Sequence, residues 1–477
     1  MEFRCCVCLG DCTQPIILNS GISMCAICAD NLQICPLTRI KITVKQSNEF
    51  VEGFFKNSTF TIKKLLNSSD RIKYMNQFDE IELDNPMLLI KNMKVLLNMD
   101  EFKLFISKCT NLNYVDRYGK QLIHYLCNDR NLVMFKYLVE HGRNVYCDML
   151  YCTDSIGASP IHYACCRNDD KALELVKFLI DHGANVNCAN NMQMRPIHYA
   201  CRGGKALELV KYLISRGAII HYTNEYGQYP IHYACYKSDE SLELVKFLIA
   251  NGANINCVDD KHRRYPIHYA CIKGDESLEI VKFLIANGAI INCTALHGHY
   301  PLHIACKKGD KALELVKILI ANGADINCID DCGRSPVHFA CEQGDESLEL
   351  VKYLVANGAM LNKVTYNLRR HPIHYACASG KGIELVKWLA TNGADVNCVD
   401  IYEGRPIHYA CLMGDEALEL IKLLVTNGDK NNHIAITNSG WSPIQLARRN
   451  GDKSVELIKY LEDKINNNWW RKKLWPF

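Results

Sequence analysis

One six-residue phrase, PIHYAC, recurs along most of this chain at a nearly constant interval. Its histidine stands at His124, His162, His198, His232, His268, His303, His338, His374 and His408, and Gln445 takes that place in the last copy. Successive copies lie 34 to 38 residues apart. A fixed period of this length predicts a solenoid of stacked units, each of which buries its apolar face only against its neighbours.

Each unit contains the signals for two helices and a turn-rich connection. The proline of the phrase favours the first turn of a short helix, where its missing N–H costs nothing. The stretch 278–285 repeats apolar residues at i, i+3, i+4 and i+7, which predicts a second helix with one buried stripe. Asn287-Gly288 then ends that helix, because glycine adopts the left-handed C-cap conformation freely. Residues 289–301 are expected to be extended and turn-rich.

The repeated phrase resembles the T-P-L-H-x-A signature of ankyrin repeats. The resemblance covers residues 85–463 and includes eroded copies at both ends, as expected of terminal caps. It implies a mostly α-helical solenoid of about ten to eleven helix-turn-helix-finger repeats. Residues 57–84 are predicted to be a linker, and residues 464–477 a basic aromatic tail that lies at a membrane interface, forms a docking motif or folds back over the last repeat.

Charge and cysteine content limit the kind of partner and the cellular compartment that we expect for the chain. Its formal net charge is only +3, so no broad basic field for nucleic acid is expected. Most of its 26 cysteines recur at fixed repeat positions, where we expect them to act as small hydrophobic residues. So many unpaired thiols indicate a reducing compartment, cytoplasmic or nuclear. Neither a signal peptide nor an apolar run long enough to span a membrane is present in the sequence.

Residues 1–56 lack the repeat and contain two C-x2-C pairs instead. These are Cys5 with Cys8 and Cys25 with Cys28, separated by 16 residues. Four thiolates at this spacing suit one tetrahedral structural Zn²⁺, which would supply folding energy that so short a segment lacks. The alternative is that these residues are ordinary surface and core thiols.

The same segment resembles a RING finger or the related U-box. The residues that carry the resemblance are the two C-x2-C pairs, Pro15 to Leu18 and Cys35-Pro36-Leu37-Thr38-Arg39. The two pairs match the four ligands of the first RING zinc site. The second site would fall on Ser20, Ile22, Cys35 and Thr38, of which only Cys35 is a good ligand. The resemblance therefore implies a small α+β module with one zinc ion and a U-box-like second half.

RING and U-box domains recruit a ubiquitin-charged E2 enzyme and do no covalent chemistry themselves. The positions that match their E2 and ubiquitin contacts are Val7, Leu32, Pro36 and Arg39. By this resemblance Arg39 would bridge E2 and ubiquitin, where its planar fork bonds two carbonyl groups and orients the thioester. Alternatively, Val7 and Leu32 belong to a core and Arg39 is a solvated surface charge.

The predicted fingers and the positions beside them are rich in arginine and tyrosine, residue types that dominate binding hot spots. Ankyrin arrays bind proteins along the concave surface of fingers and first helices. The candidate contact residues here are Arg195, Tyr229, His262, Arg263, Arg264, Tyr265, His299, Tyr300, Arg334, Arg369, Arg370, His371 and Arg405. Such a surface suits an acidic or phosphorylated partner segment. The alternative is ordinary solvated loop charge.

The repeated histidines are predicted to be structural, because they occupy equivalent positions one repeat apart and never cluster. The sequence also lacks the G-x-x-x-x-G-K, G-x-S-x-G and H-E-x-x-H motifs. The sequence hypothesis is therefore a protein similar to E3 ubiquitin ligases, in which the zinc module recruits an E2 and the array binds the substrate. The alternative is a non-enzymatic ankyrin scaffold with a structural zinc finger.

Overall fold

The computed structural model describes most of the chain beyond Met99. It covers residues 99–467 apart from gaps at 109–111, 114, 129–131, 142–145, 168, 170, 204–206 and 430. Before residue 99 it describes four short strands, β1 (Pro15–Ile17), β2 (Ser23–Cys25), β3 (Ile42–Thr43) and β4 (Glu82–Leu83). β1 pairs antiparallel with β2, and β3 with β4. The β4 strand lies in the stretch predicted to be a linker.

The chain divides into two compact units, residues 1–219 and 220–477. Among the residues that the structure describes, the helices of the first unit are α6 (Met99–Lys108), α7 (Leu122–Asn128), α8 (Leu132–His141), α9 (Tyr146–Tyr151), α10 (Pro160–Cys165), α11 (Ala172–Asp181), α12 (Pro196–Arg202) and α13 (Leu207–Ser215). Apart from α6 and α9, they alternate between the short first helix and the longer second helix of a repeat. The sequence prediction of paired helices is confirmed here.

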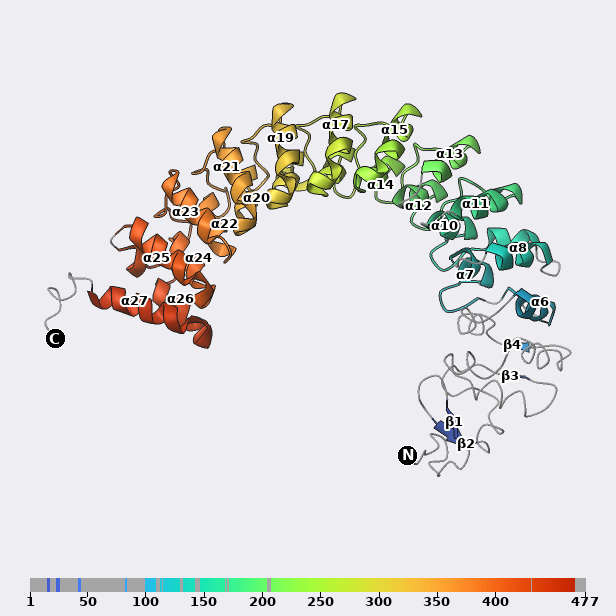
Figure 1. Cartoon of the computed structure of the whole chain (residues 1–477), viewed down its shortest axis with the longest axis horizontal. Coiled ribbons are helices and arrows are strands. Elements are labelled where there is room, and N and C mark those ends of the chain that lie inside the picture. The colour runs from blue at the N-terminus through green and yellow to red at the C-terminus, as the bar shows by residue number, and fades with distance from the viewer. Residues whose placement is uncertain are drawn as a thin grey trace. The chain divides into compact units, whose positions relative to one another are not determined.

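The second unit continues the same alternation. Its first helices are α14 (Pro230–Cys235), α16 (Pro266–Cys271), α18 (Pro301–Cys306), α20 (Pro336–Cys341), α22 (Pro372–Ala378), α24 (Pro406–Cys411) and α26 (Pro443–Arg449). Its second helices are α15 (Leu242–Ala250), α17 (Leu278–Ala286), α19 (Leu313–Ala321), α21 (Leu348–Ala356), α23 (Ile383–Thr391), α25 (Leu418–Asn427) and α27 (Val455–Asn467). Within this unit the second helices form an outer row and the first helices an inner row (Figure 1).

Short 3-10 turns complete the second unit. Most of them lead directly into a second helix: η1 (Asp239–Ser241), η2 (Gly274–Ser277), η4 (Gly309–Ala312), η5 (Gly344–Ser347), η6 (Gly414–Ala417) and η8 (Gly451–Ser454). The other two, η3 (Leu296–Gly298) and η7 (Asn432–Ile434), lie in the connections that follow second helices. The second helices end as predicted, with a left-handed glycine such as Gly252 (φ 93°) or Gly288 (φ 89°).

The core is a continuous apolar layer between the two rows of helices. In α21, Leu350, Val351 and Leu354 are fully buried, and their counterparts in the neighbouring second helices are equally inaccessible. Most first helices contribute an isoleucine, leucine or valine, an alanine and a cysteine. Cys271 and Cys341 are 0% exposed, and burial raises the pKa of both thiols. These cysteines therefore act as small hydrophobic residues, as the sequence predicted.

In most repeats the histidine joins the first helix to the following repeat. In α16, the Nδ1 atom of His268 accepts a hydrogen bond from the backbone N–H of Tyr265 at 3.1 Å. Its Nε2 atom lies 3.1 Å from the carbonyl oxygen of His299 in the next repeat. The ring must therefore be neutral, with its proton on Nε2. The histidine takes the role of the N3 residue of a capping box, so the helix begins without a Ser or Thr hydroxyl.

Two further side chains of each repeat, an asparagine and an aspartate, form hydrogen bonds to the next repeat in much of the array. Asn292 accepts a hydrogen bond from the N–H of Asp325 and donates one to the carbonyl of Gly323, at 3.0 and 2.9 Å. Asp310 accepts a bond from the N–H of Leu350 at 2.7 Å, so one repeat caps the second helix of the next. Equivalent asparagines are Asn187, Asn256, Asn327 and Asn362, and equivalent aspartates are Asp239, Asp275, Asp345 and Asp415.

We predict that the array loses stability as pH falls from about 6.5 towards 4. Burial lowers the pKa of His232, His268, His338 and His374 to about 4, from an ordinary value of 6.5. In this window the unfolded chain binds protons that the folded chain does not. Each such histidine then lowers the free energy of unfolding by about 1.4 kcal/mol per pH unit, relative to its full value above pH 6.5. Urea melts followed by circular dichroism at pH 7.5, 6.5, 5.5 and 4.5 measure the slope.

The last repeat supplies the matched control for this prediction. There Gln445 replaces the histidine, and its Oε1 atom accepts the N–H of Ser442 at 2.8 Å. His268→Gln is therefore expected to keep the cap while removing one titrating group. The slope between pH 6.5 and 4.5 should decrease by about one proton per molecule. An unchanged slope would show that the buried imidazole does not control acid stability.

Candidate partner-binding surface

The predicted contact residues fall on three positions of the repeat. Arg195, Tyr229, Tyr265, Tyr300, His371 and Arg405 are the N-cap residues of first helices. Arg264, His299, Arg334 and Arg370 occupy the position just before the N-cap. Arg263 and Arg369 precede these, in the turn at the finger, and His262 lies beside Arg263. The structure thus divides one predicted set into groups with different surroundings.

The N-cap side chains lie against the histidine of their own helix. The ring centroids of Tyr265 and His268 are 5.7 Å apart, and those of Tyr300 and His303 are 5.6 Å apart. Arg405 instead bonds the carboxylate of Asp429 at 3.3 Å. These residues are partly buried and shield the imidazole from water. They therefore contribute to the local structure as well as to the surface.

The residues before the N-cap lie over aromatic rings of the first helices. The guanidinium carbon of Arg334 is 4.3 Å from the ring centroid of Phe339 in α20. The guanidinium carbon of Arg370 is 4.6 Å from the ring of Tyr409 in α24. Cations in this geometry are attracted by the negative face of the ring. Stacking thus holds these arginines along the first helices of the second unit.

Arg263 and Arg369 have an unusual backbone. Both have φ of 51°, in the left-handed region, whereas Gly227 and Gly333 occupy the corresponding place in other fingers. A residue with a Cβ atom pays about 1 kcal/mol or more in this conformation. Both arginine side chains are exposed. This placement gives each of these two fingers an outward-facing cation at a cost in local stability.

A backbone ladder holds the finger tips of the second unit. The N–H of Tyr366 donates to the carbonyl of Cys332 at 2.8 Å, and the N–H of Ile401 donates to Leu368 at 3.1 Å. Similar bonds join residues 226 and 260, 262 and 296, 297 and 331, and 402 and 438. The tips carry large exposed side chains, with Tyr366 61% and Tyr402 52% accessible. The ladder therefore presents exposed aromatic groups from a rigid edge.

A second set of finger residues was not identified from the sequence. In most repeats an Asp or Asn at the base of the finger bonds the tyrosine hydroxyl nine or ten residues later, as Asp259 bonds Tyr269 at 2.9 Å. Equivalent pairs are Asp116 with Tyr125, Asp154 with Tyr163, Asn190 with Tyr199, Asn224 with Tyr233 and Asp400 with Tyr409. Where the tyrosine becomes Ile304, the partner position is Ala295. Both positions change together in this one repeat, and this could have indicated from the sequence that the two side chains are in contact.

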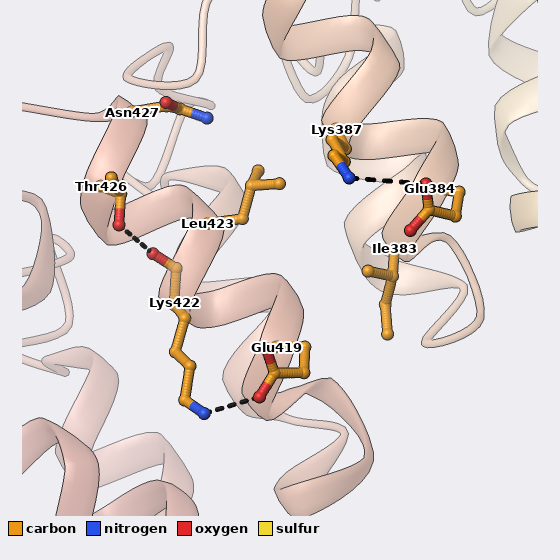
Figure 2. Close-up of a pocket in the computed structure, with 8 residues that line it drawn as sticks. All are labelled: Ile383, Glu384, Lys387, Glu419, Lys422, Leu423, Thr426 and Asn427. Carbon is orange, nitrogen blue, oxygen red and sulfur yellow. Dashed lines mark hydrogen bonds and ion pairs between the residues drawn. The ribbon is translucent and has the colours of Figure 1, made fainter.

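A groove of about 590 Å³ lies on the opposite face, between α23 and α25 (Figure 2). Ile383 and Leu423 form its apolar lining, and Glu384, Lys387, Glu419, Lys422, Thr426 and Asn427 surround them. In most other repeats an aromatic ring stands where Leu423 does, and in several of them it lies beneath a lysine of the preceding repeat. Lys317 lies 5.8 Å from the ring of Tyr353, and Lys422 lies 6.0 Å from that of Tyr460. The groove is thus present because the side chain of Leu423 is smaller than the ring it replaces.

We predict that Leu423→Phe fills this groove and stabilises the array by about 0.5–1 kcal/mol, because the new ring lies beneath Lys387. The rise in urea midpoint of the full chain measures the effect. Leu424→Phe is the matched control, since Leu424 is 0% exposed and points into the core. That variant should lose stability through overpacking. A loss of stability in Leu423→Phe as well would show that the groove does not accept a ring.

Most of the predicted N-terminal site lies outside the described residues. Cys25 is the last residue of β2. Cys5, Cys8 and Cys28 lie outside the described residues, and so do Val7, Leu32, Pro36 and Arg39. Within the described part of the chain, no cluster of three His, Cys, Asp or Glu side chains is arranged to hold a metal ion. The zinc site remains a prediction from the sequence.

Comparisons with known proteins concern the repeat region. A family model described as "Ankyrin repeats (3 copies)" matches residues 93–190, 168–259, 231–330, 302–400 and 373–469. No curated protein matches the chain. Among solved structures, the crystal structure of the human ASB11 ankyrin repeat domain is 29% identical, with a TM-score of 0.42. The match covers 50% of this chain and 98% of that one.

Proposed function

The chain belongs to the ankyrin repeat family, and we propose that its array binds a protein segment on the finger and first-helix surface while residues 1–56 recruit a ubiquitin-charged E2 enzyme. Together these parts would act as an E3-ubiquitin-ligase-like protein. The alternative is a scaffold that binds proteins without ligase activity. Within the described residues, no helix is long and apolar enough to cross a membrane.

The observation that carries the first half is the rigid, exposed edge of the finger tips. Exposed aromatic side chains on a fixed backbone lose little entropy on binding and supply large contact area. Tyr366, Ile401 and Tyr402 form such a group on neighbouring fingers, which the finger ladder holds together. Exposed Arg369, in the strained left-handed conformation, stands beside them. Arg and Tyr are the residue types that most often carry binding energy.

We predict that peptides selected from a random display library on the full chain bind at this edge. Tyr366→Ala combined with Tyr402→Ala should weaken them at least about tenfold, as expected for two hot-spot residues. Lys282→Ala is the matched control, because Lys282 lies on a second helix and pairs with Glu279 at 2.7 Å. Fluorescence anisotropy gives the affinities. Equal losses in both variants, or selected peptides insensitive to either, would contradict binding at the finger tips.

The second half of the proposal rests on the spacing of Cys5, Cys8, Cys25 and Cys28 and on the resemblance to RING and U-box modules. In this proposal one structural zinc ion would hold the four thiolates. Val7, Leu32 and Pro36 would contact the E2, and Arg39 would orient the E2–ubiquitin thioester. The module itself would perform no covalent step. The charged E2 would then transfer its ubiquitin to a substrate bound on the array.

We predict that Arg39→Ala slows ubiquitin discharge from a charged E2 by about tenfold or more, because two charge-assisted hydrogen bonds are lost. Affinity for the uncharged E2 should barely change. Val7→Ala should instead weaken E2 binding, since it removes apolar contact. Single-turnover discharge measured beside an E2-binding titration separates the two effects. A wild-type chain that is inactive with every E2 tested would favour the scaffold alternative.

A further inference from the structure

A row of cations runs along the first helices of the second unit. Four consecutive repeats carry a basic residue just before the N-cap, Arg264, His299, Arg334 and Arg370, whereas the repeats on either side carry Gln228 and Gly404. Lys307, which directly follows α18, adds another cation between them. Because α16 contacts α18, α18 contacts α20 and α20 contacts α22, these residues succeed one another along a single surface.

The centre of this row holds two cations over one ring. The Lys307 ammonium group lies 4.8 Å from the ring centroid of Phe339, and the Arg334 guanidinium carbon lies 4.3 Å from it. Burial lowers the pKa of Lys307, and the neighbouring charges of Arg334 and Arg264 lower it further. Lys307 forms no ion pair with any residue in the described part of the chain. An anion placed here would relieve that repulsion.

Two carboxylates of this region, Asp259 and Asp330, lie beneath the cations rather than beside them. Asp330 is only 1% exposed at its side chain, and it bonds Arg334 at 2.8 Å. Asp259 accepts the hydroxyl of Tyr269 and the N–H of His262, at 2.9 and 2.6 Å. Glu342 differs from them, because its side chain is 31% exposed and lies 3.5 Å from Arg334, whose own side chain is 24% exposed. Asp259 and Asp330 are thus occupied by internal bonds, and in the layer that faces solvent the cations Arg264, Lys307, Arg334 and Arg370 outnumber Glu342.

The backbone of the row is fixed on both sides. The carbonyl of His299 receives the Nε2–H of His268 at 3.1 Å, and that of Arg370 receives the Nε2–H of His338 at 3.3 Å. The carbonyl of Arg334 accepts the N–H of Asp330 at 3.0 Å. Stacking on Tyr269, Phe339 and Tyr409 limits the side chains as well. A partner therefore meets cations that are already positioned, which lowers the entropic cost of binding.

We propose that this row binds an extended, acidic segment of a partner protein whose carboxylate or phosphoryl groups recur at about every third residue. Packed helices lie roughly 9 Å apart, and an extended chain advances roughly 3.3 Å per residue, so about three residues span one repeat. The partner chain runs across the first helices, and its anions meet Arg264, Lys307, Arg334 and Arg370 in turn. This inference rests on the proposed protein-binding function and names the chemistry of its partner.

Three labelled peptides test the proposal with the full chain. One carries Asp at every third position among Ser and Gly, the second has the same composition with the Asp residues adjacent, and the third carries phosphoserine at every third position. Fluorescence anisotropy should show the spaced Asp peptide binding about tenfold tighter than its isomer. Tighter binding of the phosphoserine peptide identifies phosphoryl groups as the preferred source of charge. Equal affinity of the two Asp isomers overturns the proposal.

Lys307→Gln isolates the centre of the row, because the exposed ammonium group pairs with no described carboxylate. It should weaken the spaced peptide about threefold, as expected for a partly screened ion pair. Lys311→Gln is the matched control, an exposed lysine four residues further along the chain, and should leave the affinity unchanged. Wild-type affinity in Lys307→Gln overturns the assignment. Equal competition by a single-stranded oligothymidylate also overturns it, since the row would then be a general polyanion site.

The library-selected peptides separate this inference from the proposed function. If they bind the finger edge but contain no recurrent acidic residues, and the spaced Asp and phosphoserine peptides do not bind, the array still binds protein and only the acidic partner is wrong. If no selected peptide depends on Tyr366 and Tyr402, the proposed binding edge fails first. A selected set with Asp, Glu or phosphoserine mimics at every third position supports both.

Discussion

The neutral histidine of the first helix is the interaction on which the array depends. A single ring accepts a hydrogen bond from its own N-cap N–H and donates another to a carbonyl of the next repeat, as His374 does to His371 and Gly404. The start of a helix and its attachment to the neighbouring repeat are therefore one interaction. Protonation of Nδ1 would break the first bond and place a charge in the core, so burial and function of the ring require the neutral form.

This arrangement releases the N-cap residue from its usual task. A helix that begins with Ser or Thr relies on the hydroxyl to satisfy a backbone N–H. In α16 and α24 the caps are Tyr265 and Arg405, and the helix still begins normally because the N–H of the histidine bonds the backbone carbonyl of the cap residue while the imidazole accepts the N–H of that residue. The cap position and the one before it can then vary between repeats without loss of the helix. Variation of this kind provides a binding surface on a constant frame.

Much of the fold could be predicted from the sequence, because the prolines and apolar stripes indicate the helices within one repeat and the period indicates that the repeats stack. The connections between repeats were harder, since each joins residues 25 to 42 positions apart, as Asp415 joins Leu457. Where Arg or Tyr precedes the proline, no Ser or Thr hydroxyl is available to cap the helix. Only the structure revealed that the backbone carbonyl of the cap residue accepts the N–H of the histidine, as Tyr265 does from His268 at 3.0 Å, and that His Nδ1 accepts the N–H of the cap residue. A comparison of the repeats with one another would have detected paired changes, such as that of Ala295 and Ile304.

The candidate surface was predictable in composition but not in arrangement. Arg264 and Tyr265 are adjacent in sequence, yet one lies over the ring of Tyr269 and the other against His268. The direction of each side chain depends on which neighbour offers a ring. The groove at Leu423 was not predicted for a related reason. It lies where α25 lacks the aromatic ring that a lysine of the preceding repeat covers elsewhere. The E2 contacts and three of the four zinc ligands lie outside the described residues, and the zinc site and the E2 surface stay predictions.

The two faces of the second unit differ in how they balance charge, and this difference decides which one suits recognition. On the second helices most lysines bond the glutamate three residues earlier, as Lys317 bonds Glu314 at 2.6 Å and Lys352 bonds Glu349 at 2.6 Å. Such pairs neutralise one another locally and offer little to a charged partner. On the first helices Asp259 and Asp330 lie below the cations and are used in internal bonds, while the cations lie over aromatic rings. Charge separated by depth in this way leaves a field that extends into solvent, so the first-helix face is the one that attracts an acidic chain.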